Sequence, residues 1–503
     1  MSNQLWEGHN IDINVFDNRY GTAVAFVKKS IFSSNSSLDV EEDFKSIRDF
    51  ELLKRLGYKG KGTFYAQVSN ILYVGLEDLD LHGYANSSCI AIKALKSLNI
   101  KDAYFDLVGL DSTLQWHVVR AILLGEYEYK GFKRDDNKDS SSSIDKPNTA
   151  EKLKISLIGV DDSILQRAKI ICSRVNFVRD IVNTPPNIAN SIFLSNLAQN
   201  ETIAVAKRQK EHEIKAILRS NSYMEEQKMG AFLAVNQTSN FPAFLAHLSY
   251  KPKHAGSSTK RIALVGKGLV YDTGGLSLKP ADYMTTMKAD KSGACAVLGI
   301  FLAVAELGLD VELHAIMGIT DNAIGSNAYR PDDVLISREK KSIEVKNTDA
   351  EGRLVLVDCL SYAQDLEPDL IVDFATLTGA CVVALGEYTS GVMGYNDSLK
   401  QQFVDSALRS GELAHTLPFN PHLKKLIESK IADVSNTSSS RYGGAITAGM
   451  FLGEFIRDEY KDKWLHIDIA GPAFVEKEWG VNPYGASGAG VLAFIEFLSS
   501  IIK

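Results

Sequence analysis

The sequence has little cysteine, no long apolar run and no surplus of basic charge. Its five cysteines are scattered through 503 residues, and none shows the spacing of a zinc finger or a redox pair. Most stand in apolar contexts, which is typical of reduced core residues in a cytoplasmic protein. No apolar run reaches the roughly 18 residues that a membrane span needs. We therefore expect no membrane segment and a cytoplasmic location.

The charge balance and the start of the chain argue against two further classes of protein. There are 55 basic and 62 acidic residues, a formal charge of −7, which disfavours a general nucleic-acid surface. Residues 1–7 lack a basic stretch followed by an apolar core, so we expect no secretory signal. No internal repeat or heptad pattern is present. With 45% hydrophobic residues, the chain suits a globular protein of two or three domains.

Residues 1–160 predict a small α/β domain, because strand-like and helix-like patterns alternate there. The predicted strands are 11–16, 22–27, 63–68, 71–76, 103–108 and 154–160, and the predicted helices are 88–96 and 114–124. A charged, serine-rich stretch at 133–152 predicts an exposed loop. Residues 161–186 predict a linker helix that ends at Pro185-Pro186. No motif in the first domain indicates a chemical function.

Residues 187–503 predict a larger α/β domain with a central mixed sheet flanked by helices. The predicted strands are 231–235, 244–248, 262–265, 311–317, 370–374 and 464–469. Helices are predicted at 292–307, 354–365, 399–411 and 449–460. The overall fold class is therefore α/β, with the chemistry expected in the second domain.

The first chemical signal in that domain is a pair of carboxylates, Asp349 and Glu351, followed by Arg353. If the segment is extended, alternate side chains point to one face, so both carboxylates reach the same point. Gly352, directly after Glu351, allows backbone or ligand to come close. A lone Asp-x-Glu is more often an ordinary polar loop, so this pair needs support from elsewhere.

That support is a second cluster about sixty residues upstream, which holds Lys267, Asp272, Lys279 and Asp290. It follows the apolar run 262–265, at the strand end where open α/β sheets place their ligands. Four crowded carboxylates repel one another unless cations neutralise them. Buried lysine–aspartate ion pairs, one magnesium or calcium ion, and two divalent ions would each serve. Two adjacent ions fit best, because four carboxylates can bridge and terminate such a pair.

At these residues the chain resembles the leucyl aminopeptidase (cytosol aminopeptidase) family of two-metal exopeptidases. The resemblance covers roughly residues 160–500. The segments that carry it are Lys267, Asp272, Lys279 and Asp290 with 347–354, and further 183–187, 375–380, 443–449 and 466–471. In this family the region that matches the first domain is a separate α/β domain that contributes to assembly.

The resemblance implies a role for each polar residue. Asp272 and Glu351 would bridge two metals, Asp349 would bind one of them, and Asp290 with a neutral Lys267 amine would bind the other. Lys279 would stabilise the oxyanion, and a bicarbonate near Arg353 would serve as general base. The ligand shell is mainly hard oxygen, so manganese or zinc is expected, with cobalt or magnesium as alternatives.

The resemblance also implies the substrate and the assembly. One metal would bind the free α-amino group of a peptide, which restricts hydrolysis to the N-terminal residue. The side chain of that residue would be leucine-like or methionine-like, because its pocket would be lined by Met287, Thr376, Leu377, Gly379 and Ala470. The family typically forms a homohexamer, a dimer of trimers. Two alternatives stay open: a catalytically inactive hexameric scaffold or nucleic-acid accessory protein, and an enzyme restricted to dipeptides such as Cys-Gly.

Two positions depart from the family pattern. Lys291 directly follows Asp290, where relatives more often carry an uncharged residue; pointing inward, it would weaken cation binding. The segment 484–490 lacks the arginine and proline that are frequent in relatives, which puts local packing or a trimer contact in doubt. His466 has no partner at metal spacing, so we expect a core histidine.

Overall fold

The computed structural model describes residues 11–15, 19–28, 49–132 and 152–502, and these residues divide between two compact units. The first unit runs to Ser173 and includes Lys477–Pro483, a segment that the sequence division assigned to the larger domain. The second unit holds Arg174–Glu476 and Tyr484–Lys503. The division falls inside helix α5 (Asp162–Asn183), which the sequence analysis took as the linker. Apart from Lys152, the predicted serine-rich loop lies outside the described residues.

The first unit is built on a six-stranded sheet with the order β1-β6-β5-β2-β4-β3. Its strands run parallel to their neighbours except β3, which pairs antiparallel with β4. Helices α3 and α4 pack against each other, and α3 packs on β4. The elements are β1 Ile11–Val15, β2 Thr22–Lys28, α2 Phe50–Arg55, β3 Thr63–Ala66, β4 Ile71–Leu76, α3 Leu81–Ser97, β5 Asp102–Asp106, α4 Ser112–Gly125 and β6 Leu153–Ile158.

The second unit is built on an eight-stranded mixed sheet, β15-β14-β17-β13-β9-β10-β8-β7. The central strands β17, β13, β9 and β10 are mutually parallel, whereas β8 and β7 run antiparallel at one side. The strands are β7 Glu213–Arg219, β8 Phe244–Lys251, β9 Arg261–Asp272, β10 Glu312–Asn322, β13 Leu370–Ala375, β14 Thr389–Met393, β15 Leu413–Thr416 and β17 Trp464–Asp468. This mixed sheet flanked by helices confirms the predicted fold class.

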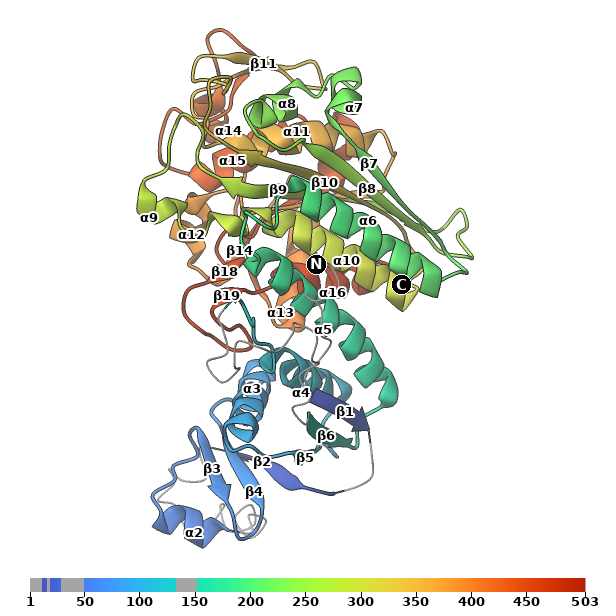
Figure 1. Cartoon of the computed structure of the whole chain (residues 1–503), viewed down its shortest axis with the longest axis vertical. Helices are drawn as coiled ribbons and strands as arrows, with labels where there is room; N and C mark the ends of the chain where they lie inside the picture. The colour runs from blue at the N-terminus through green and yellow to red at the C-terminus, as the bar shows by residue number, and fades with distance from the viewer. Residues whose placement is uncertain (1–10, 16–18, 29–48, 133–151, 503) are drawn as a thin grey trace, which may run out of the picture. The chain divides into compact units, whose positions relative to one another are not determined.

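Helices cover both faces of the large sheet (Figure 1). Helices α6 and α10 pack on one face, and α8 and α11 pack on the other. The helices are α6 Ser191–Arg208, α7 Asn221–Glu226, α8 Gly230–Asn236, α9 Ala281–Met284, α10 Ser292–Leu307, α11 Glu351–Gln364, α12 Gly379–Leu385, α13 Asp397–Ser410, α14 Pro421–Lys424, α15 Gly444–Gly453 and α16 Val491–Ile501. Short pieces complete the unit: the 3-10 turns η2 Met287–Lys291, η3 Lys425–Ile427 and η4 Asp458–Lys463, and the strands β11 Val334–Ile336, β12 Ser342–Glu344, β16 Val434–Ser435, β18 Phe474–Val475 and β19 Gly485–Ala486.

The central strand β9 determines where chemistry can occur. It pairs in parallel with β10 on one side and with β13 on the other. After β9 the chain adds β10 on one side of it and later places β13 on the other side. This change of direction opens a crevice at the carboxyl end of β9. Asp272, the last residue of β9, faces Asn322 at the end of β10. Ligand-binding groups are expected in this crevice.

Three local predictions were wrong. Residues 231–235, predicted as a strand, belong to helix α8; a short apolar run cannot distinguish a buried helix from a buried strand. The strand predicted at 262–265 continues to Asp272, so Lys267 lies inside β9 instead of in a loop. The helix predicted at 449–460 is α15, which spans Gly444–Gly453. In the described part of the chain, no helix combines the length and apolar character needed to cross a bilayer.

Candidate metal centre and substrate cavity

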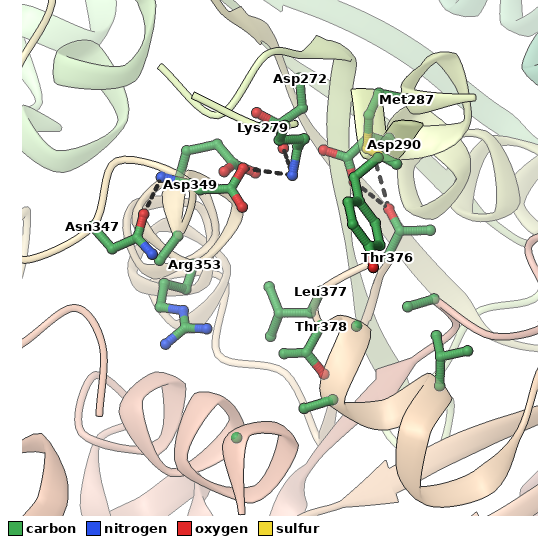
Figure 2. A pocket seen from close by; sticks show the side chains of 18 of the residues that line it. Asp272, Lys279, Met287, Asp290, Asn347, Asp349, Arg353, Thr376, Leu377 and Thr378 are labelled. Carbon is green, nitrogen blue, oxygen red and sulfur yellow. Dashed lines mark hydrogen bonds and ion pairs between the residues drawn. The ribbon is translucent and has the colours of Figure 1, made fainter. Parts of the chain in front are cut away.

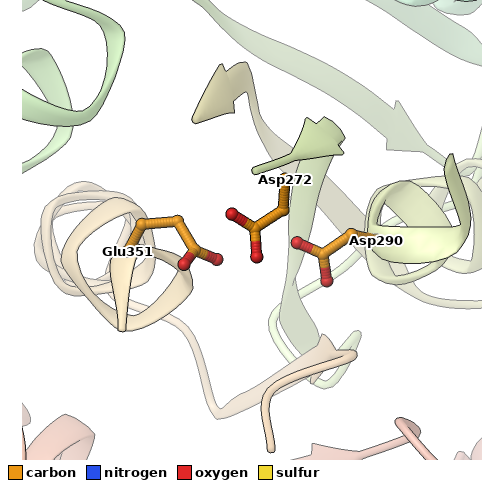
Figure 3. Close-up of side chains that lie close together, drawn as sticks. All are labelled: Asp272, Asp290 and Glu351. Atoms are coloured by element: carbon orange, nitrogen blue, oxygen red, sulfur yellow. The ribbon is translucent and has the colours of Figure 1, made fainter. Parts of the chain in front are cut away.

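Three carboxylates from separate elements converge at the carboxyl edge of the sheet (Figure 3). Asp272 ends β9, Asp290 lies on the 3-10 turn η2, and Glu351 is the first residue of α11. One oxygen of each lies within 4.8 Å of the others, and the residues are only 2%, 6% and 1% exposed. Glu351 is at the start of α11, where the helix dipole favours a negative charge. Three buried like charges at this spacing require a cation.

Lys267 supplies one cation from the interior of β9. Its Nζ lies 2.8 Å from Asp290 Oδ1 and 3.0 Å from Glu351 Oε1, and it donates to the carbonyl of Thr376 at 2.8 Å. Burial disfavours the ammonium, but the surrounding carboxylates outweigh it and raise the pKa of Lys267 above its ordinary value. In this structure the Lys267 side chain is therefore protonated, and its ammonium lies between Asp290 and Glu351.

Lys279 joins the cluster to the fourth predicted carboxylate, Asp349 (Figure 2). Its Nζ lies 2.9 Å from Asp272 Oδ2 and 2.5 Å from Asp349 Oδ1. The expectation that Asp349 and Glu351 share one face of an extended strand was wrong. Asp349 lies in a turn, where its N–H donates to the Asn347 side chain at 2.8 Å, and Glu351 begins a helix. The two carboxylates still reach neighbouring points, because the turn directly precedes the helix.

The two loops that carry these groups are tied together by residues that the sequence analysis did not single out. The Thr348 hydroxyl donates to the Gly274 carbonyl at 2.7 Å and accepts from the Ser277 N–H at 2.7 Å. The Asn322 amide donates to Asp272 Oδ1 at 2.9 Å and to the Thr348 carbonyl at 3.0 Å. Thr348 stood in the family motif, but Asn322 ends an apolar strand and gave no local signal.

The carboxylates remain short of positive charge and of hydrogen-bond donors. Burial, and after it the neighbouring charge of Asp272, raises the pKa of Glu351 to about 8, and burial also raises the pKa of Asp290 and Asp349. Asp290 Oδ2 and Glu351 Oε2 are buried and have no hydrogen-bond partner. A buried acceptor without a partner is costly, whereas hard divalent cations bind such oxygens readily. The residues present therefore fit divalent metal ions.

Arg353 lies two residues after Glu351, in the first turn of α11, and is 7% exposed. Its Nη1 donates to the Asn436 carbonyl at 2.7 Å, but its Nε is buried without a partner. Burial lowers the pKa of Arg353 to about 10, which leaves the guanidinium charged at neutral pH. A buried guanidinium with a free donor fits a small planar anion.

These groups line one cavity of about 740 Å³, together with all the other predicted site residues. Met287 and Thr376 lie across the cavity from Asn347 (Figure 2). The other three residues predicted for the side-chain pocket, Leu377, Gly379 and Ala470, also line the cavity. Their roles stay predictions, but the structure brings the whole predicted set together around a single space. Three exposed charged residues that the sequence analysis did not name, Glu387, Arg441 and Glu476, also line it.

Asp468 positions part of the pocket lining through hydrogen bonds. This buried carboxylate accepts from the Leu377 N–H at 3.1 Å, the Thr378 hydroxyl at 2.8 Å and the Ala470 N–H at 3.1 Å. Two residues earlier on β17, His466 is fully buried and its Nδ1 lies 2.5 Å from Asp373 Oδ1. His466 is thus a core histidine, although its Nε2 has no hydrogen-bond partner.

The two departures from the family pattern have structural explanations. Lys291 is fully buried, but its Nζ points to the carbonyls of Val182, Thr184 and Lys288 at 3.2, 3.3 and 2.6 Å. It thus caps the carboxyl end of α5 and does not line the cavity. The segment at 484–490 is held by α5 as well, because Asn183 Oδ1 accepts from the Ala486 N–H at 3.0 Å and Arg179 Nε donates to the Ser487 carbonyl at 2.9 Å.

Buried carboxylates and lysines around a cavity at the carboxyl edge of a parallel sheet are typical of a hydrolytic metal centre. Comparisons with known proteins give the same class. Residues 176–495 match the model of the cytosol aminopeptidase family, catalytic domain. The chain is 55% identical over 452 residues to a probable cytosol aminopeptidase of Helicobacter hepaticus, covering 89% of this chain and 92% of that protein. It is 49% identical over 477 residues to one of Campylobacter jejuni, covering 94% and 95%.

A solved structure supports the likeness in three dimensions. The cytosol aminopeptidase of Coxiella burnetii aligns with a TM-score of 0.81 at 26% identity, covering 98% of this chain and all of the other. The chain therefore belongs to the cytosol aminopeptidase family, whose members are two-metal, metal-dependent aminopeptidases.

Proposed function

We propose that this chain removes the N-terminal residue of peptides with two divalent ions held by Lys267, Asp272, Asp290, Asp349 and Glu351. The observation that carries the proposal is the buried carboxylate cluster, with unpartnered oxygens on Asp290 and Glu351, at a cavity large enough for a short peptide. Two divalent ions bound there would lower the pKa of a water molecule and polarise the peptide carbonyl.

The two lysines have different tasks in this proposal. Lys267 must release its proton to act as a ligand, because an ammonium group has no lone pair. Its place between Asp290 and Glu351 marks the position that a cation occupies. Lys279 stays protonated beside Asp272 and Asp349, and because it lines the cavity its ammonium would face the scissile carbonyl of a bound peptide. A fixed cation there stabilises the negative charge that develops on the carbonyl oxygen.

The general base is proposed to be a bicarbonate on Arg353. The unpartnered Nε and the burial of the guanidinium support an anion at this point. Bound there, bicarbonate would accept the proton of the attacking water. No histidine lines the cavity, so among its lining residues the chain offers no imidazole for this step.

The free α-amino group of the substrate would be bound on the Asp290 side, and its side chain would lie against the wall that contains Met287, Thr376 and Ala470. This wall is mainly uncharged, which supports a preference for leucine-like residues. Manganese and zinc remain the proposed metals, on the chemistry of the oxygen-rich ligand set. A homohexamer in the cytoplasm is proposed from family likeness, and the burial of all five cysteines is consistent with a reducing compartment.

The variant Glu351→Ala tests the metal centre. Loss of one carboxylate should reduce bound metal and lower the rate of leucine p-nitroanilide hydrolysis by about a thousand-fold, the equivalent of several kcal/mol. Metal content is measured by elemental analysis after dialysis, and Glu428→Ala, an exposed position outside the cavity, is the matched control. N-acetyl-leucine p-nitroanilide should not be cleaved by either protein. Full activity and metal content in Glu351→Ala would refute the proposal.

A further inference from the structure

Arg441 differs from the other cations that line the cavity. Lys267 and Lys279 form ion pairs with carboxylates, and Arg353 is buried and donates to a backbone carbonyl. Arg441 is exposed, and its guanidinium stacks over the Tyr442 ring with 5.3 Å between the guanidinium carbon and the ring centroid. Within the described residues it has no carboxylate within ion-pair distance. Stacking leaves the in-plane N–H groups free to bind an anion.

Arg441 lies on a loop that lines the cavity between the Asn347 side and helix α15, where Gly444 lies beside Ala380. The loop that carries it starts at Asn436, whose amide donates to the Asn347 carbonyl at 2.7 Å and whose Oδ1 accepts from the Lys346 N–H at 2.8 Å. The Ser440 hydroxyl accepts from the Tyr442 N–H at 3.2 Å, so the backbone on both sides of Arg441 is fixed. Asn347 lies across Lys279 from Met287 and Thr376 (Figure 2).

The opposite wall carries charge of the other sign. Glu476 lines the cavity two residues after Phe474 in the sequence. Glu387 lines it as well, and its backbone lies beside Gly471, the residue that follows Ala470. In the part of the chain that the structure describes, neither carboxylate has an ion-pair partner. A peptide with its first side chain against this wall would extend its remaining residues toward Asn347 and Arg441. A carboxylate is therefore repelled at the first position and attracted beyond the scissile bond.

We infer that Arg441 is a specificity-determining residue that binds a carboxylate in the part of the peptide beyond the bond that is cleaved. The carboxylate belongs either to an acidic side chain at the second position or to the free carboxyl terminus of a dipeptide. This inference rests on the proposed aminopeptidase function and narrows its substrate class. Helix α15, which begins at Gly444 without a side-chain cap, adds the positive end of its dipole to the same wall.

The expected size of the effect follows from the exposure of Arg441. A partly solvated guanidinium–carboxylate pair contributes a preference of about three- to ten-fold, and added salt weakens it. The preference should appear mainly in KM, because the charge pair is made equally in the bound substrate and in the transition state.

Two pairs of substrates differ only in one charge. Leu-Asp-amide against Leu-Asn-amide measures the side-chain carboxylate, and Leu-Gly against Leu-Gly-amide measures the carboxyl terminus. For each pair the ratio of kcat/KM is determined for the wild-type protein, Arg441→Gln, Arg441→Lys and the control Arg330→Gln. Arg330 is exposed, pairs with Asp333 and does not line the cavity.

The inference predicts a ratio of about three to ten in favour of the charged substrate for at least one pair. Arg441→Gln should bring that ratio to about one, Arg441→Lys should restore part of it, and Arg330→Gln should keep it. The pair that responds identifies the source of the carboxylate. A wild-type ratio of one for both pairs, or a preference that survives in Arg441→Gln, would overturn the inference while the proposed function stands. Failure to cleave the neutral substrates would overturn both.

Discussion

Substituting Gly352 by alanine should impair metal binding and activity strongly while changing the stability of the fold only slightly. Gly352 follows Glu351 in the first turn of α11, against the end of the Lys267 side chain. A Cβ at this position would lie 2.5 Å from Lys267 Cε, 2.6 Å from Nζ and 2.7 Å from Cδ. Carbon atoms in contact normally stay about 3.5–4.0 Å apart. The amine must therefore retreat by about 1 Å.

A retreat of that size removes Lys267 from its contacts with Asp290, Glu351 and the Thr376 carbonyl, which are 2.8–3.0 Å long. Lys267 is 3% exposed and is closely surrounded by Asp290, Glu351 and the Thr376 carbonyl, so its amine cannot move without losing these contacts. A displaced ligand costs about 10- to 100-fold in metal affinity, and a misplacement of about 1 Å costs about 100-fold in rate. We expect Gly352→Ala to lose metal on dialysis and about 99% of leucine p-nitroanilide hydrolysis.

The same change should have a small effect on folding. Alanine favours the helix over glycine by up to about 1 kcal/mol, which offsets part of the roughly 1–3 kcal/mol cost of overpacking. Urea denaturation of the metal-free proteins should therefore show a loss below about 2 kcal/mol. Gly256→Ala, at an exposed loop glycine with open space around its Cβ position, is the control. Full metal retention and activity in Gly352→Ala would refute the packing argument.

Two other substitutions test separate parts of the structure. Lys279→Met removes the ammonium between Asp272 and Asp349, and we expect kcat to fall by about 100- to 1000-fold while most of the metal stays bound, as measured by steady-state kinetics and elemental analysis; an unchanged kcat would exclude Lys279 from oxyanion stabilisation. His247 hydrogen-bonds to Tyr362 and His314, and burial, then the charges of His314 and Arg219, lower the pKa of His247 to about 4. Its unfolded pKa is about 6.5, so its contribution to the unfolding free energy is present above pH 6.5 and is lost, up to about 3 kcal/mol, as the pH falls toward 4. The unfolding free energy of His247→Gln should therefore depend less on pH between 6.5 and 4 in urea titrations, and an unchanged pH dependence would contradict the assignment.

The sequence predicted elements well where a pattern was long and uniform. The apolar run of α10, Ser292–Leu307, and the apolar strand β4, Ile71–Leu76, have the predicted bounds. Prediction from the sequence failed where a polar residue lies inside a helix or strand. Gly266, Lys267 and Gly268 suggested a loop, yet β9 continues because β10 pairs with it in register as far as Leu269 and Thr320 and, after an irregularity, again at Asp272 and Asn322. The edge strands β7 and β15 were missed, since their half-exposed patterns are weak without the neighbours that they pair with, and the short buried strand β14 was missed as well.

The candidate site was predictable in its residues but not in its construction. The family motifs named every residue that was expected to line the cavity, because chemistry restricts which side chains stand there. They did not indicate that Asn322 orients Asp272, or that Asp468 accepts hydrogen bonds from the backbone N–H groups of Leu377 and Ala470. These supporting residues come from strand ends far away in the chain, and only the packed sheet brings them into contact.

Lys291 shows why a departure from a family pattern cannot be evaluated from its neighbour in sequence. Asp290 and Lys291 lie on a 3-10 turn, in which successive side chains diverge by about 120° around the axis. The carboxylate therefore faces the cavity while the ammonium faces the carbonyls at the end of α5. Lys288, three residues earlier and thus on the same side as Lys291, donates to the Asn183 carbonyl at 2.9 Å. Two lysines together fasten the turn that presents Asp290, so a charge that suggested a weakened metal site instead supports the position of one of the proposed ligands.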